Sequence, residues 1–128
     1  LLARMKEILG DKVTEVRVSH RLADSPAVLV SPDGGMSSSM EKLLKVMQKD
    51  DSLPVKVLEV NRDHPLLRNM LRMFKAEGQD RILAEMTRSL FDASLLLDGY
   101  LKDPQALAAR TNGLLAEAAA WYTELRKI

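Results

Sequence analysis

The chain has 128 residues, 46% of them hydrophobic, which suits one domain with its own core and is too short for two. The 19 lysines and arginines nearly balance the 18 aspartates and glutamates, and a net charge of +1 argues against general binding of nucleic acid or of an anionic membrane. Cysteine is absent, so disulfides and cysteine chemistry are excluded and we expect a cytoplasmic protein. No apolar run approaches the roughly 20 residues that cross a bilayer, and no signal-peptide pattern is visible.

The beginning of the chain predicts a short helix followed by two strands. Apolar residues at helical spacing predict a helix that starts near Leu2 and stops at Gly10. β-branched residues within 13–18 and the apolar run 27–30 predict the two strands. Because the chain starts inside a helical pattern and without an initiator methionine, we expect it to be part of a longer protein.

A methionine-rich stretch follows a turn at 31–35, where a Pro-Asp pair and two glycines favour a loop. Residues 36–48 then have the periodicity of an amphipathic helix, here called the methionine helix. Its apolar positions are Met36, Met40, Leu43, Leu44 and Met47. They could face the core of the domain, which the residues alone favour, or form an adaptable surface for partners, because methionine is flexible and polarizable.

The remaining residues predict a third strand and three helices. Alternation over 54–60 indicates the strand, and cap residues before Pro65 indicate a helix. A broad apolar stripe over 82–97 predicts the next helix, and Asp103 followed by Pro104 predicts the start of a last helix that runs almost to the end of the chain. The expected fold class is therefore α+β, a small three-stranded sheet packed with helices.

The two C-terminal helices carry more apolar surface than they can cover on each other. Such stripes could close a bundle within one chain or form an interface between two copies. A four-helix bundle across a two-fold axis would bury the remainder, and the residues alone leave the two arrangements open.

Motifs for catalysis or cofactor binding are sparse. Asp33, Gly34 and Gly35 lack the rest of a phosphate-binding loop. His20 and His64 are the only candidates for a metal ligand or general base, and neither has a second ligand at suitable spacing. We expect no enzymatic activity and no metal, with a small catalytic or regulatory subunit that uses His64 as the rival hypothesis.

Four segments match a known family in their order and spacing, and together they extend to about residue 116. They are residues 16–22 with 25–27, residues 36–43, residues 58–64 and residues 101–104. Through them the chain resembles the C-terminal dimerization domain of the ninety-kilodalton heat-shock protein chaperones, in particular the bacterial high-temperature protein G type.

The resemblance implies a constitutive homodimer held by the C-terminal helices, and 1–128 as a single domain. We expect the dimer interface at Leu95, Leu96, Leu107, Thr111, Leu114 and Leu115. The resemblance also implies that the methionine helix faces the cleft between protomers and contacts unfolded or partly folded client proteins, which reverses the core interpretation above. A purely structural dimer module is the alternative. ATP and magnesium would belong to an N-terminal domain of the parent protein, so no cofactor is expected here.

The chain departs from the family pattern in places. Arg62 stands where relatives often have proline, which leaves that turn less rigid, and the acidic pentapeptide that recruits co-chaperones in eukaryotic relatives is absent, so partners of that kind are not expected. Residues 117–128 exceed the expected length. Their apolar spacing predicts that the last helix continues, and leaves open whether Trp121, Leu125 and Ile128 lengthen the dimer interface or fold against their own chain.

Overall fold

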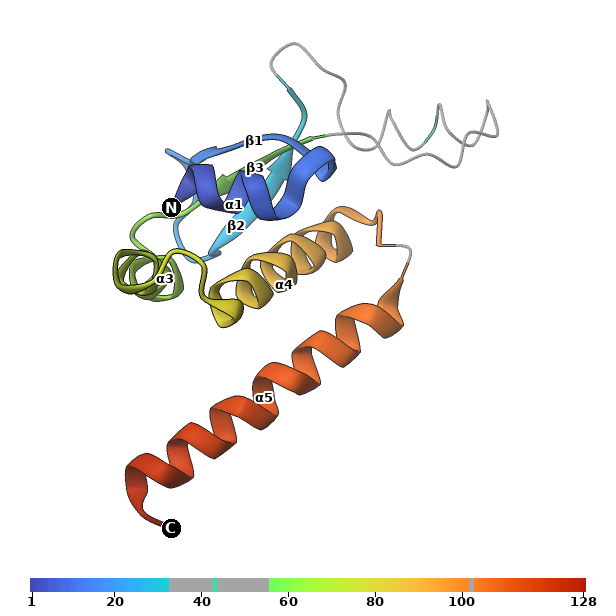
Figure 1. Cartoon of the computed structure of the whole chain (residues 1–128). Helices are drawn as coiled ribbons and strands as arrows, with labels where there is room; N and C mark the ends of the chain where they lie inside the picture. The colour runs from blue at the N-terminus through green and yellow to red at the C-terminus, as the bar shows by residue number, and fades with distance from the viewer. Residues whose placement is uncertain (33–42, 44–55, 102) are drawn as a thin grey trace.

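A computed structural model describes residues 1–32, 43, 56–101 and 103–128 (Figure 1). Within these residues the helices and strands, in chain order, are α1 (Leu2–Leu9), the short 3-10 helix η1 (Gly10–Lys12), β1 (Val13–Val18), β2 (Ala27–Val30), β3 (Lys56–Val60), α3 (Pro65–Ala76), α4 (Arg81–Asp98) and α5 (Pro104–Arg126). The predicted α+β class with a three-stranded sheet is confirmed. Apart from Leu43, the methionine helix lies outside the described residues.

The sheet has the order β1-β3-β2, so the strand that comes last in the chain lies in the middle. β3 is parallel to β1 and antiparallel to β2. All five residues of β3 are buried, which is expected of a central strand that has neighbours along both edges. Leu58 lies opposite both Val16 and Leu29, so apolar side chains from all three strands meet on one face of the sheet.

Helices α1 and α4 contact that face and each other, α1 against β1 and α4 against β2. The core lies between these helices and the sheet, and α3 adds Leu67 and Met70 to it. Met5, Leu58 and Leu83 are completely buried in this core. Each large side chain buried in this way stabilises the fold by roughly 1.5–3 kcal/mol, so the position of α4 is well determined by the core.

The long helices begin at side-chain caps. His64 Nδ1 accepts a hydrogen bond from the Leu66 amide at 3.1 Å at the start of α3, and the Asp103 carboxylate accepts one from Ala106 at 3.0 Å at the start of α5. Asp80 caps α4 in the same way, although the sequence analysis did not single it out. The predicted start of the last helix and its continuation past residue 116 are confirmed, because α5 runs to Arg126.

The turn after β3 is intact although Arg62 replaces the proline expected there. Asn61 holds it, because its side-chain oxygen accepts from the Asp63 amide at 3.1 Å and its amide nitrogen lies 3.3 Å from the carbonyl oxygens of both Ala23 and Ser25. These contacts join the turn to the loop between β1 and β2. A buried asparagine therefore supplies the rigidity that a proline ring would otherwise give.

Candidate functional site

Helix α5 contacts α4 along the outside of the molecule (Figure 1). None of its 23 residues is buried against the described part of the chain. Most helices in proteins gain their stability from packing an apolar face, so a 23-residue helix with no fully buried residue lacks part of its packing. The inner face of α4, in contrast, is buried in the core.

An apolar groove of about 440 Å³ lies between α4 and α5. Its lining comes mainly from these two helices and consists of Leu66, Met86, Ser89, Leu90, Ala93, Leu107, Thr111, Leu114, Leu115, Ala118 and Trp121. The Ser89 hydroxyl is buried there and has no hydrogen-bond partner among the described residues. The rest of the lining is almost entirely apolar, which is typical of a surface that another apolar surface covers.

The structure brings four of the six predicted interface residues together along this groove, and they are Leu107, Thr111, Leu114 and Leu115. Leu96 is 54% exposed on α4, outside the groove lining. Leu95 differs from the others, because it is only 8% exposed and belongs to the core of its own chain, one turn after the buried Phe91. The prediction for Leu95 took the broad stripe of α4 as one surface, whereas its inner part packs on the sheet.

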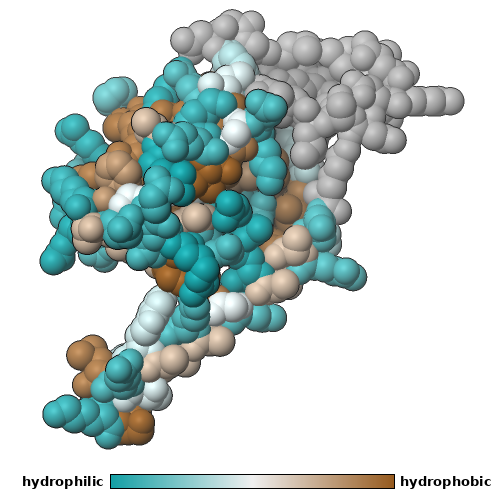
Figure 2. Space-filling model, viewed as in Figure 1, coloured by the Kyte–Doolittle hydropathy of each residue, from teal (hydrophilic) through white to brown (hydrophobic). Residues whose placement is uncertain are grey.

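The C-terminal turns of α5 present further apolar side chains. Trp121 lines the end of the groove. Leu125 and Ile128 are 78% and 82% exposed, so they do not fold against the described part of their own chain. Figure 2 shows hydrophobic atoms gathered at this free end of the helix. A lengthened interface at Trp121, Leu125 and Ile128 stays a prediction.

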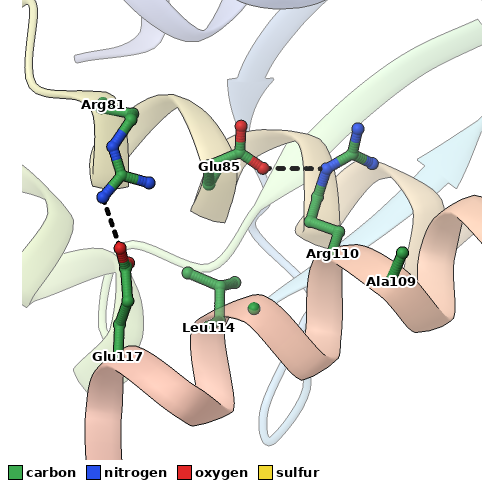
Figure 3. A pocket seen from close by; sticks show the side chains of 7 residues that line it. Arg81, Glu85, Ala109, Arg110, Leu114 and Glu117 are labelled. Carbon is green, nitrogen blue, oxygen red and sulfur yellow. Dashed lines mark hydrogen bonds and ion pairs between the residues drawn. The ribbon is translucent and has the colours of Figure 1, made fainter. Parts of the chain in front are cut away.

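The other flank of the α4–α5 contact is charged (Figure 3). Arg110 Nε donates a hydrogen bond to Glu85 at 3.2 Å, and the same guanidinium also pairs with Asp92. Further along, Arg81 pairs with Glu117, and this hydrogen bond raises the pKa of Arg81 above its ordinary value. This pairing between the helices was not identified from the sequence.

The methionine helix is described only at Leu43, which is helical and 52% exposed. Met36, Met40, Leu44 and Met47 lie outside the described residues. Their predicted contact with clients stays a prediction.

The histidines do not form a chemical site in the described part of the chain. His64 caps α3 through Nδ1, and His20 is exposed. Among the described residues no group of three His, Cys, Asp or Glu side chains could hold a metal ion. No helix in this part of the chain is long and apolar enough to cross a membrane. The geometry thus favours α4 and α5 as the functional surface.

Comparison with known proteins identifies the family. The family model described as Hsp90 protein matches residues 1–126. The chain belongs to the Hsp90 protein family. Its relatives include proteins named Chaperone protein HtpG: the one from Oleidesulfovibrio alaskensis is 59% identical over all 128 residues, and the one from Nitratidesulfovibrio vulgaris is 55% identical over 126 residues, 98% of this chain. The one from Chlorobium phaeovibrioides is 37% identical over 118 residues, 92% of this chain.

The chain spans about one fifth of the length of these curated relatives, 20%, 20% and 19% respectively. The resemblance stated from the sequence is therefore confirmed at the level of the family.

Proposed function

We propose that this chain is the C-terminal homodimerization domain of an ATP-dependent Hsp90-family chaperone, and that α4 and α5 form its interface. The observation that carries the proposal is the apolar groove beside a 23-residue helix that buries none of its residues against the described chain. The relatives named Chaperone protein HtpG support the chaperone part of the proposal.

The occupant that fits the groove is the helical hairpin formed by α4 and α5 of a second copy of the chain. The groove runs between two helices, and the apolar face of another helix is the shape that fills such a space. Two hairpins related by a two-fold axis would form a four-helix bundle in which each copy covers the other. Because the interface would be isologous, each leucine along the groove would contribute to it once from each copy.

The proposed interface contains five of the predicted residues, Leu96, Leu107, Thr111, Leu114 and Leu115, and is lengthened by Trp121, Leu125 and Ile128. Leu95 is left out because it already packs in its own core. Covering a half-exposed leucine contributes roughly 1 kcal/mol, so the stability of the dimer would be distributed over many such side chains.

Dimerization would serve the chaperone by keeping two chains together. An N-terminal ATPase domain on each chain would then meet its counterpart at a high effective concentration, so that their closure becomes an intramolecular event. In this proposal the stretch itself binds no nucleotide and no metal, and the whole protein works in the cytoplasm.

A second role for the methionine helix rests on Leu43. A leucine that is 52% exposed on a helix is available to an apolar partner. We propose that this helix offers unfolded or partly folded clients a weak, adaptable contact. Replacing Met40 and Leu43 with serine should lower protection of a client from aggregation and leave the thermal transition of the domain unchanged. Loss of the thermal unfolding transition would instead show that these side chains belong to the core, as the alternative of a purely structural dimer module predicts.

The dimer interface can be tested with a matched pair of leucines. Leu115→Glu places a charge on the groove at a position that is 61% exposed in the single chain, so folding of one copy should be unaffected. Leu71→Glu makes the same change at an exposed leucine of α3, away from the groove lining. Sedimentation velocity should find the first variant monomeric and the second dimeric. Dimers of equal affinity for both variants would refute the proposed interface.

A further inference from the structure

The contact between α4 and α5 has two flanks of different character, with Leu114 lining both. On one flank lies the apolar groove. On the other, ion pairs cross between the helices. On the groove side only Leu107 and Leu114 of α5 are half-buried, and none of the α5 residues that line the groove is fully buried. The charged flank therefore adds specific, directional contacts between the helices.

Arg110 is the centre of this flank. Its guanidinium pairs with Glu85 and with Asp92, which lie two helical turns apart on α4. All three side chains are partly buried, so their pairing is screened less by solvent than a pair on an open surface. The five donors of a guanidinium suit such bridging, because they can reach two carboxylates at once, whereas a single ammonium group gives less geometric definition.

The second pair determines the same alignment. Glu117 lies two turns after Arg110 on α5, and its partner Arg81 lies one turn before Glu85 on α4. Both contacts therefore require the same antiparallel register of the two helices (Figure 3). Sliding α5 by one turn along α4, about 5.4 Å, would break both contacts.

From this geometry we infer that Arg110 is a positioning residue for self-association. It holds α5 in the register and at the distance that keep the apolar groove open to a second copy, without itself providing the apolar contact. The inference rests on the proposed homodimer. It assigns a function to a charged flank that would otherwise look like a solvated surface.

The first test compares two arginines on the same helix. Arg110→Ala removes the link to α4, whereas Arg126→Ala removes an arginine that donates to the hydroxyl of Tyr122, one turn earlier on α5 itself. Both copies of a dimer carry each substitution, so Arg110→Ala should raise the Kd of self-association by about tenfold or more. Arg126→Ala should leave the Kd within about twofold.

A charge exchange provides a second, independent test. Arg81→Glu alone places two carboxylates opposite each other and should weaken association. Adding Glu117→Arg restores an ion pair of reversed polarity and should bring back most of the affinity. Because Arg81 and Glu117 lie at the surface, neither change should disturb folding of the core, which the far-UV thermal transition would check.

The dependence of the Kd on salt distinguishes an electrostatic positioning role of Arg110 from a purely structural one. Raising sodium chloride from about 0.1 M to about 1 M shortens the Debye length from about 10 Å to about 3 Å. The ratio of the Kd of Arg110→Ala to that of the wild type should shrink over this range, and salt effects on apolar contacts cancel in the ratio.

The outcomes separate the inference from the proposed function. A wild-type chain that stays monomeric at all concentrations contradicts the homodimer itself. A dimeric wild type whose Kd is matched by Arg110→Ala overturns the positioning role of Arg110 and leaves the homodimer standing. An exchange variant no better than Arg81→Glu alone contradicts the helix register on which that role depends.

Discussion

Replacing Lys56 with methionine should destabilise the domain by about 3 kcal/mol, because the change breaks a buried ion pair. The Lys56 side chain is 2% exposed. Its Nζ lies 2.6 Å from a carboxylate oxygen of Asp98 and 4.8 Å from the centre of the Tyr100 ring. Methionine has a similar length and fills the space without charge. Asp98 then loses its ion pair with Lys56 and faces an apolar side chain in its place.

The magnitude follows from the burial of the two partners. Removing one member of a buried pair costs about 3–5 kcal/mol. The Asp98 side chain is 17% exposed and retains some contact with water, which puts the loss at the lower end of this range. Against a total stability of about 5–15 kcal/mol the effect is large. It should appear as a lower midpoint in urea denaturation followed by circular dichroism, at one fixed protein concentration.

Two further variants sharpen this test. The double variant Lys56→Met with Asp98→Leu removes both charges and should recover most of the lost stability, since an apolar pair of similar volume avoids the cost of burying charged groups. Lys75→Met changes an exposed lysine of α3 and should stay within about 0.5 kcal/mol of the wild type. A Lys56→Met variant as stable as Lys75→Met would refute the reasoning.

Three substitutions test smaller effects. His64→Ala should remove the cap of α3 and lower the free energy of unfolding, measured in urea, by about 1 kcal/mol. His64→Asn keeps a hydrogen-bond acceptor and should retain most of this stability. If His64 were catalytic, asparagine would not restore activity. Asp103→Ala should cost about 1 kcal/mol and speed amide hydrogen exchange in the first turn of α5, and unchanged exchange would contradict the cap. Ser89→Ala should be neutral or stabilising in thermal unfolding, because the buried hydroxyl has no partner among the described residues; a clear loss would reveal one.

The elements of this fold could be predicted from the sequence because each has a strong local signal. α4 and α5 are long and periodic, Asp103 and Pro104 mark a helix start, and β-branched residues mark β1. A less rigid turn was expected at Arg62, because the role of the Asn61 side chain in holding this turn was not identified from the sequence.

The side chains that depend on tertiary packing could not be predicted. Alternation over 54–60 indicated the strand but not the burial of Lys56, which lies on the same face as the core residue Leu58 and pairs with Asp98 of α4. Leu95 lies on a stripe wide enough for two surfaces, so its periodicity could not decide between core and interface. The pairing of Arg110 depends on the antiparallel register of α4 and α5, which the sequence does not state, although the two-turn spacing of Arg110 and Glu117 was a visible signal.

The mass of the unmodified chain in solution tests the central claim most directly. Light scattering or sedimentation equilibrium over a concentration series should give twice the 14.3 kDa of one chain, with dissociation to the single mass only on dilution. A mass of 14.3 kDa at every concentration up to about 1 mM, which corresponds to a binding free energy weaker than about 4 kcal/mol, would contradict the proposed homodimer.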